Sequence, residues 1–305
     1  MDPKGNGRRP PHIPVLLGET INGLDLKPGN SVIDCTVGAG GHSAVMLERT
    51  APDGRLLGLD IDEAALDAAR MRLSRFGSRV MLVRANYREV EKAVSDHRFG
   101  PAQAALLDLG YSSMEIDDPE RGFGFRADGP LDMRFDRRQE LTAADLVNSL
   151  SEGDLASILA KYGEERYARR IAERIAAERE KHPLQRTFEL VDAVARAVPA
   201  HYRHGKLHFA TRTFQALRIA LNDELGNLEE ALPALLRVLA PGGRLAVISF
   251  HSLEDRIVKN FFRQAESEGS VKTVTRRPIT AQTGEIRENP RSRSAKLRLA
   301  EKTTV

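Results

Sequence analysis

Residues 31–43 read SVIDCTVGAGGHS, a short apolar run that ends at Asp34 and passes at once into a glycine-rich turn. Glycines such as Gly38, Gly40 and Gly41 let a backbone turn tightly and approach a ligand closely. A helix that begins at the end of such a turn presents free backbone N–H groups to the ligand. This stretch therefore predicts a strand, a ligand-binding turn and a helix, the first unit of an α/β fold.

Strand and helix patterns continue to alternate as far as residue 109. The apolar runs that predict strands are SVIDC (31–35), RLLGLD (55–60), RVMLV (79–83) and AALLDL (104–109). Helical spacing occurs at residues 41–50, 63–76 and 86–97. Near-continuous apolar strands are typical of a parallel sheet that helices cover on both faces. Since crossovers in such sheets are right-handed, we predict a doubly wound, Rossmann-like α/β fold.

A long segment without a convincing strand pattern interrupts this alternation after residue 111. It opens with a Gly-, Asp- and Pro-rich stretch (117–130) and continues with amphipathic helical patterns, notably at 154–181 and 188–198. A connection of this length is too long to be a loop. We therefore predict a helical domain inserted at residues 112–210.

The α/β pattern returns after the insertion. It comprises helices at 216–221 and 225–239, the strand RLAVISF (244–250), a further helix, and late strands near 271–274 and 296–300. The further helix begins at about Leu253, where Ser252 and Asp255 have the spacing of a capping box. The predicted sheet domain thus consists of residues 1–111 and 211–305.

The composition is that of an ordinary soluble globular protein, with 41% hydrophobic and 29% charged residues. The longest apolar runs, such as residues 245–250, are far shorter than the roughly 20 residues of a membrane-spanning helix. The first residues, MDPKGNGRRPPH, contain no apolar signal-peptide core. The only cysteine, Cys35, excludes a disulfide framework and a cysteine-based metal cluster. We therefore expect a cytoplasmic protein without a membrane segment or a bound metal.

Basic residues are concentrated in two stretches, although the net charge is only +3. One stretch comprises Arg276, Arg277, Arg287, Arg291, Arg293, Lys296 and Arg298, and the other comprises Arg166, Arg169, Arg170, Arg174, Arg179 and Lys181. Such clusters neutralise phosphate groups in nucleic-acid-binding proteins. They equally fit a solvated helix face or a polar tail, and charge alone does not decide between these interpretations.

The glycine turn differs from the fingerprint of dinucleotide-binding proteins. Ser43 stands three residues after Gly40, where that fingerprint has a third glycine. Asp34 ends the first strand, as in methyltransferases, which accommodate a cationic amino acid in place of a pyrophosphate. Asp60 follows about 20 residues after the glycines, the spacing of a carboxylate that binds ribose hydroxyls, although a strand-terminal Asp alone is more often a cap. Tyr87, after the third strand, could stack on adenine or simply cover the sheet end.

The motif Asp108-Leu-Gly-Tyr111-Ser112-Ser113 follows the fourth strand, at the edge where open α/β sheets bind ligands. Its layout resembles the Asp-Pro-Pro-Tyr arrangement of amino-methylating enzymes. The exocyclic amine of cytosine or adenine is a poor nucleophile, and a carboxylate that accepts its N–H bond favours the attacking geometry. We therefore predict Asp108 as the catalytic residue and Tyr111, Ser112 and Ser113 as contacts to an extruded base. The alternative is that Asp108 only caps the turn.

Two further residues bear on the chemistry. Methylation at cytosine C5 normally needs a cysteine nucleophile, and Cys35 lies inside the glycine turn, which disfavours that reaction. One cysteine also cannot hold an iron–sulfur cluster, which excludes radical chemistry. His251 follows the strand at 244–250, and we predict that it contacts the base or the RNA. A histidine at a turn is, however, more often a hydrogen-bonded structural group.

Together the motifs resemble those of the bacterial small-subunit ribosomal RNA cytosine-N4-methyltransferase family, known as RsmH or MraW. The matching segments run nearly end to end and in family order: His12 with PVLL (14–17), DCTVGAGGHS (34–43), LLDLGYSS (106–113), RGFGF (121–125), DGPLDMR (128–134), YGEER (162–166), ATRTFQALRI (210–219), PGGRLAVISFHSLEDRIVK (241–259) and NPRSRSAKLR (289–298). Several of these segments are too long to match by chance, so the resemblance is highly specific.

The resemblance implies a class I methyltransferase that uses S-adenosyl-L-methionine and recognises its substrate with the inserted helical domain. It implies methylation of N4 of one cytidine in the decoding region of small-subunit rRNA, in an assembled or nearly assembled subunit. It leaves a homodimer open. The family's cofactor contacts match Gly40, Gly41, His42, Asp60, Tyr87, Asp108 and Glu115.

This chain departs from the family at two of these sites. The family usually has Val at Tyr111 and Gln at Glu115, so base stacking by Tyr111 cannot be general, and the contact at Glu115 is uncertain in charge. Two other classes of function are weaker. A non-catalytic RNA-binding assembly factor predicts a degenerate cofactor turn, whereas Gly38, Gly40 and Asp60 are intact. A nicotinamide dehydrogenase is disfavoured by the glycine spacing and the lack of a proton-relay pair.

Overall fold

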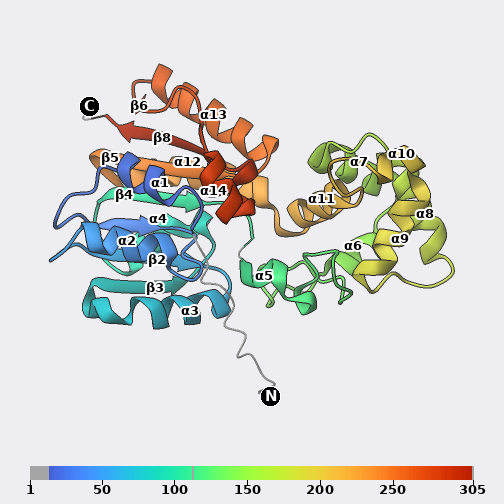
Figure 1. The fold of residues 1–305 in the computed structure, drawn as a ribbon. Coiled ribbons are helices and arrows are strands. Elements are labelled where there is room, and N and C mark those ends of the chain that lie inside the picture. The colour runs from blue at the N-terminus through green and yellow to red at the C-terminus, as the bar shows by residue number, and fades with distance from the viewer. Residues whose placement is uncertain (1–13, 112, 304–305) are drawn as a thin grey trace, which may run out of the picture.

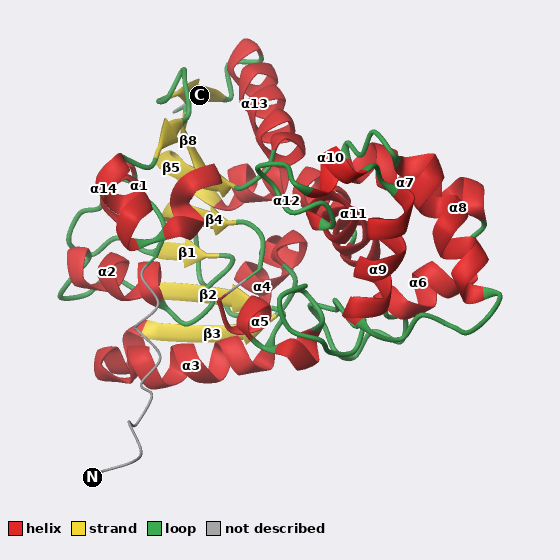
Figure 2. Cartoon of the chain, turned by 45° about the vertical axis from the view of Figure 1, so that its right-hand side comes forward, coloured by secondary structure: helices red, strands yellow, loops and turns green. Residues whose placement is uncertain are grey.

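A single eight-stranded sheet organises the first and last parts of the chain (Figures 1 and 2). The computed structural model describes residues 14–111 and 113–303, so His12 lies outside it. The strands are β1 (Val32–Asp34), β2 (Leu56–Asp60), β3 (Val80–Arg84), β4 (Ala102–Asp108), β5 (Leu239–Ser249), β6 (Val271–Thr273), β7 (Ile279–Thr280) and β8 (Lys296–Lys302). Their order is β3-β2-β1-β4-β5-β8-β6, with β7 paired to β8. The first five strands run parallel, and β8 is antiparallel to its three neighbours.

Helices cover both faces of this sheet. One face packs against α1 (Leu17–Gly23), α2 (Gly41–Arg49) and α3 (Glu63–Leu73), and the other against α4 (Val90–Asp96), α12 (Glu224–Val238) and α13 (Ser252–Ser267). Successive strand residues alternate between the two layers: Val32 and Leu56 are buried on the first face, and Ile33 and Leu57 on the second. The sequence prediction of a doubly wound α/β fold is confirmed.

The strands predicted in the first half of the chain agree with the structure to within two residues at each end. The strand β5, predicted at 244–250, begins earlier because Leu239 pairs with Ala102 of β4 before a shift in register. Smaller elements complete this part: α14 (Thr283–Glu288) and the 3-10 helices η1 (Ser74–Arg79), η2 (Tyr87–Glu89) and η4 (Pro290–Ser294).

The middle of the chain forms a helical part beside the sheet (Figures 1 and 2). Its elements are α5 (Ser113–Asp117), η3 (Pro119–Arg121), α6 (Ala143–Ser149), α7 (Glu152–Gly163), α8 (Ala168–Arg179), α9 (Thr187–Ala197), α10 (Ala200–Arg203) and α11 (Thr211–Asn222). Residues between Phe123 and Leu221 make a hydrophobic core of their own. Within residues 14–111 and 113–303, every helix is too short or too polar to span a lipid bilayer.

Two details of the helical part differ from the sequence analysis. The predicted helix at 154–181 is two helices, because Glu164 adopts a left-handed conformation (φ 48°) that ends α7. The end of the insertion was predicted at residue 210, but Phe214 and Leu217 of α11 are buried in the helical core. The helical packing therefore continues to Asn222, and the chain re-enters the sheet part at α12.

Candidate active site at the carboxyl edge of the sheet

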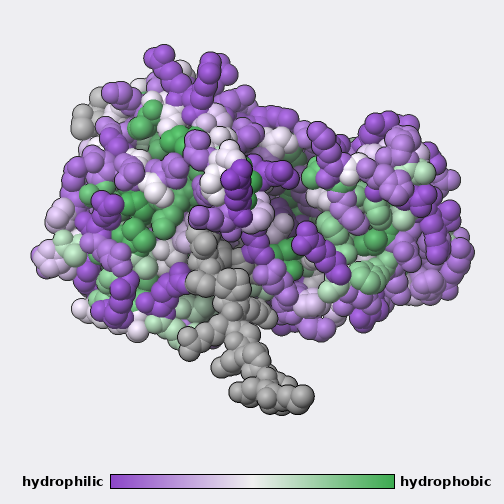
Figure 3. All heavy atoms as spheres, in the orientation of Figure 1, coloured by the Kyte–Doolittle hydropathy of each residue, from purple (hydrophilic) through white to green (hydrophobic). Residues whose placement is uncertain are grey.

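The predicted site residues meet at the carboxyl ends of four neighbouring parallel strands. Asp34 ends β1, Asp60 ends β2, Asp108 ends β4, and His251 follows β5 closely. The strand order reverses between β1 and β4, and such a switch point is where open α/β sheets bind ligands. The surface of the molecule is hollowed between the sheet and the helical part (Figure 3).

The glycine turn after β1 packs too tightly for side chains. Gly40 adopts a φ of 76°, the left-handed conformation that favours glycine, immediately before α2. A Cβ atom on Gly41 would lie 2.5 Å from Pro14 Cγ. The Gly38 N–H donates to Asp60 Oδ2 at 2.9 Å, which joins the turn to the end of β2. The turn and Asp60 therefore form one unit.

The two aspartates at the ends of β1 and β2 are hydrogen-bonded, with Asp34 buried and Asp60 partly buried. Asp34 accepts from Ser43 Oγ at 2.6 Å and from the Thr36 N–H at 3.2 Å. Ser43, which stands where dinucleotide sites have a third glycine, thus anchors α2 to β1. Asp60 also accepts from the Asp62 N–H at 3.0 Å. Burial raises the pKa of Asp34 and of Asp60 to about 6 each.

Asp108 has a less satisfied carboxyl group. Its Oδ1 atom is buried and finds no hydrogen-bond partner among the described residues, and its Oδ2 lies 3.6 Å from His42 Nδ1. His42 Nε2 lies 3.0 Å from the Val15 carbonyl, which only accepts, so Nε2 carries a proton. Burial, with the charges of Asp34 and Glu254, raises the pKa of Asp108 to about 8.

Tyr111 forms a partly open aromatic platform three residues after Asp108. Tyr111 is exposed, with 42% of its surface accessible to solvent. The ring lies over the Arg218 guanidinium, 4.8 Å from ring centroid to Cζ, in a cation–π contact. Arg218 is buried and donates from Nε and Nη2 to the two oxygens of Glu224 at 2.7 and 2.9 Å. The bidentate pair holds the guanidinium, and the ring on it, in place.

His251 caps helix α13. Its Nδ1 accepts from the Glu254 N–H at 3.4 Å, and Glu254 Oε2 accepts from the backbone N–H groups of Phe250 and His251 at 2.8 and 3.2 Å. The capping box predicted at Ser252 and Asp255 therefore lies one residue earlier, at His251 and Glu254. Ser252 Oγ instead donates to Glu164, and Asp255 pairs with arginine and lysine of β8.

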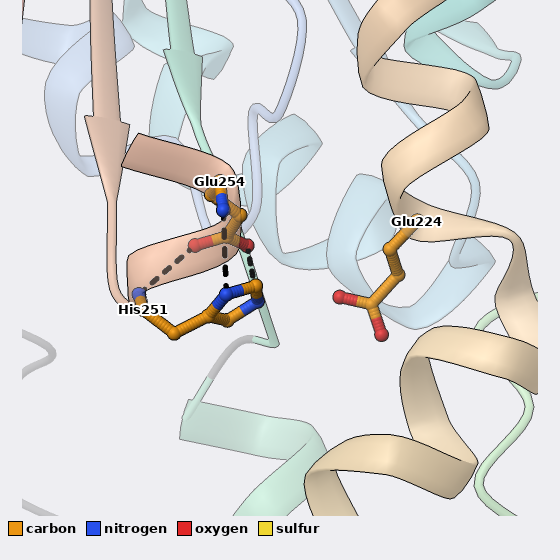
Figure 4. Close-up of side chains that lie close together, drawn as sticks. All are labelled: Glu224, His251 and Glu254. Carbon is orange, nitrogen blue, oxygen red and sulfur yellow. Dashed lines mark hydrogen bonds and ion pairs between the residues drawn. The ribbon is translucent and has the colours of Figure 1, made fainter. Parts of the chain in front are cut away.

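Glu224, His251 and Glu254 lie close enough to hold a metal ion, with ligand atoms within 4.8 Å of one another. Glu224 points from α12 toward the other two (Figure 4). The hydrogen bonds argue for a different use of these groups. Because His251 Nδ1 accepts a backbone N–H, the neutral ring carries its proton on Nε2 and offers no lone pair there. Both Glu224 oxygens are also engaged by Arg218. Together with Arg218, these three residues form a cluster joined by hydrogen bonds and ion pairs, which we call the charge cluster.

Two predicted cofactor residues lie farther from the glycine turn. The Tyr87 hydroxyl donates to the Glu224 carbonyl at 3.1 Å, and the ring packs against the core. Glu115 is buried on α5, 3.6 Å from Arg121 Nη2. Arg121 also bonds to Asp62 at 2.7 Å, so the two carboxylates share one guanidinium. Contacts of Tyr87 and Glu115 to a cofactor stay predictions.

The serines after Tyr111 give little structural information. Ser112 lies outside the described residues, and Ser113 begins α5. Sequence reasoning missed Arg121, Arg218 and Glu224. For Arg218 a signal existed, since an arginine among the apolar residues of TFQALRIALN (213–222) must be paired if that helix face is buried.

The basic stretches are only partly available to a ligand. Lys296 and Arg298 pair with Asp255 at 3.2 and 2.7 Å. Arg291 is exposed and pairs with Asp117 of α5 at 2.8 Å, next to the helical part. The other exposed members are Arg166, Arg169, Arg170, Lys181, Arg276, Arg277, Arg287 and Arg293. Phosphate contact by these residues stays a prediction.

Comparison with known proteins agrees with this geometry. Residues 9–303 match the model of the MraW methylase family. A protein of Heliobacterium mobile is 51% identical over 95% of this chain and 98% of its own length, and one of Symbiobacterium thermophilum is 50% identical over 94% and 95%. Both are named Ribosomal RNA small subunit methyltransferase H. The chain thus belongs to the MraW methylase family.

Proposed function

We propose that this protein transfers the methyl group of S-adenosylmethionine to the exocyclic N4 amine of a cytidine in the decoding region of small-subunit ribosomal RNA. Its family is a methylase family, and relatives at 50% and 51% identity are named for small-subunit ribosomal RNA. The observation that carries the proposal is the partly buried Asp108 carboxyl at the switch point, whose Oδ1 atom lacks a hydrogen-bond partner among the described residues. An amine N–H suits this acceptor.

The edge of the sheet fits a cationic cofactor. Asp34, Asp60 and Asp108 lie at neighbouring strand ends, and the charge of Asp34 helps to raise the pKa of Asp108. A positive ligand would relieve this repulsion. S-adenosylmethionine supplies an activated methyl group on a positive sulfonium. We propose that the backbone at Gly40 and Gly41 approaches it closely and that Asp60 binds its ribose.

Asp108 is suited to orient the amine and then to take up its proton. An ionised carboxylate accepts an N–H bond and fixes the direction of the nitrogen lone pair. In the protein without cofactor the pKa of Asp108 is about 8, so its carboxyl is mostly protonated at neutral pH, and the positive sulfonium of the bound cofactor favours the ionised form. N-methylation leaves the nitrogen with an extra proton, which this carboxylate can accept. His42 Nδ1, 3.6 Å from Asp108, offers the next position for that proton.

The thiol of this chain is not placed for covalent catalysis. Cys35 is buried in the core beneath the sheet, and burial raises its pKa well above the usual range. A protonated thiol in an apolar core is a poor nucleophile. This supports direct transfer to nitrogen and argues against attack on the ring carbons.

Calorimetric titration with S-adenosylmethionine and, separately, with NAD tests the proposal against its alternatives. A methyltransferase binds the first and passes a labelled methyl group to small-subunit rRNA. Binding of neither compound would indicate an assembly factor, and binding of NAD alone would indicate a dehydrogenase. An assembled subunit as substrate, a cytoplasmic location and a homodimer stay predictions.

A further inference from the structure

In the charge cluster of Arg218, Glu224, His251 and Glu254, the residues His251 and Glu254 follow β5, on the side of β4 away from the glycine turn. The turn and Asp60 belong to β1 and β2, whereas His251 follows β5, the other neighbour of β4. A methyl donor bound by the turn would therefore leave the β5 side of Asp108 for the base. The cluster faces this second side.

His251 presents an Nε2–H donor that has no hydrogen-bond partner among the described residues. Its side chain is 10% exposed, and Nε2 lies 3.2 Å from Glu254 Oε1 but without hydrogen-bond geometry to any described residue. The cap bond to Nδ1 places the proton on Nε2. A buried donor left in this state costs free energy unless a ligand accepts from it.

The surrounding residues complete a receptor for a flat, polar ring. Tyr111 is partly open and is held on the Arg218 guanidinium. Arg218 is in turn bonded to Glu224, whose carboxylate points toward His251 and Glu254 (Figure 4). A ring stacked on Tyr111 would bring its edge toward His251.

We propose that His251 Nε2–H reads the ring edge of the target base by donating to N3 or O2 of cytosine, and that Glu254 positions the imidazole. The inference rests on the proposed function and adds a second protein contact to the target base, besides the contact with Asp108. With Asp108 accepting from N4 and His251 donating to the neighbouring edge, the base is held in one orientation. Uracil, whose N3 carries a hydrogen, presents a donor to the His251 donor there and binds less well.

Two substitutions separate base reading from helix capping. His251→Asn keeps an oxygen able to accept the Glu254 N–H, since Asn is a favoured cap, but lacks a donor at the Nε2 position. His251→Gln keeps an N–H group near that position and forms a poorer cap. Ser252→Ala, at the adjacent residue, serves as the matched control. Small subunits from a strain lacking this gene are the substrate.

We expect His251→Asn to lower kcat/KM for the subunit about 10- to 100-fold, with unchanged calorimetric affinity for S-adenosylmethionine. His251→Gln retains most of the activity, and Ser252→Ala behaves as wild type. Wild-type kcat/KM in the Asn variant, or an equal loss of cofactor affinity, would overturn the inference. Failure of the proposed function is distinct, because the wild-type protein itself would then leave the rRNA unmethylated.

Discussion

Asp108 combines burial, an unsatisfied oxygen and nearby negative charge in one side chain. Replacing it with Asn keeps the shape but removes the anion that accepts the amine N–H and the site that takes its proton. We expect Asp108→Asn to lower the rate of methyl transfer about 10²- to 10⁴-fold while the protein still binds RNA. Single-turnover transfer of a radiolabelled methyl group measures this loss, and a wild-type rate would contradict the assignment.

The same substitution has a defined effect on stability. Below about pH 4 both the folded and unfolded states hold the Asp108 proton, because the usual pKa is 3.8. Between about pH 4 and 8 the folded state alone keeps it, so this carboxyl lowers the free energy of unfolding as pH rises through that window. We expect the Tm of Asp108→Asn to rise relative to wild type between pH 5 and pH 8, measured without cofactor. Parallel Tm curves would show that the pKa of Asp108 is not raised.

Tyr111 is a second residue whose role can be isolated. The substitution Tyr111→Val removes the ring over Arg218. Stacking of a base on an aromatic ring contributes about 1–3 kcal/mol. We expect KM for the subunit to rise about tenfold with little change in kcat. An unchanged KM in steady-state assays would show that the ring does not contact the base.

At the scale of elements, a buried ion pair joins the helical part to the sheet. Arg121 of η3 donates to Asp62, the cap of α3, at 2.7 Å, and both side chains are largely buried. Arg121→Met leaves Asp62 without this partner, which we expect to cost about 3–5 kcal/mol of unfolding free energy. Chemical denaturation measures the change.

An exposed pair provides the control for that change. Lys92 and Asp96 pair one turn apart on α4, and Lys92→Ala should leave the free energy of unfolding nearly unchanged because the pair is exposed to solvent. If the two substitutions lowered the free energy of unfolding equally, burial of the Arg121–Asp62 pair would contribute nothing to stability.

The elements also show which parts of the site a sequence can reveal. The strand-end residues Asp34, Asp60 and Asp108 were predictable, because the ends of parallel strands share one edge. The charge cluster was not, because it joins Arg218 of α11 to residues of α12 and α13. Helical periodicity says which face is buried but not which helix ends meet.

For the whole molecule, the start of the insertion stays a prediction, and its predicted end divides a helical core. The alternation of strands and helices visibly stops after Tyr111. Helix α11 has the same amphipathic pattern whether it packs on the sheet or on α7, so only the structure shows that it belongs to the helical core.

The distribution of charge over the molecule predicts how it binds RNA. Arg291 and Arg293 are exposed on η4, and Arg291 reaches α5 where the helical part begins. We expect replacement of both by Ala to reduce the slope of log K against log salt concentration by about 1–2, because each phosphate contact contributes about 0.7–0.9. Arg237→Ala, at an exposed arginine outside both basic stretches, should leave the slope unchanged. A double variant with the wild-type slope would exclude these residues as phosphate contacts.

The most direct test is to identify the methylated atom. Small subunits from a strain lacking this gene are incubated with the protein and S-adenosylmethionine, and the rRNA is digested and mapped by mass spectrometry. The account predicts one new methyl group, on N4 of a cytidine in the decoding region. A methyl group on a ring carbon or on another base, or no new methyl group, would contradict it.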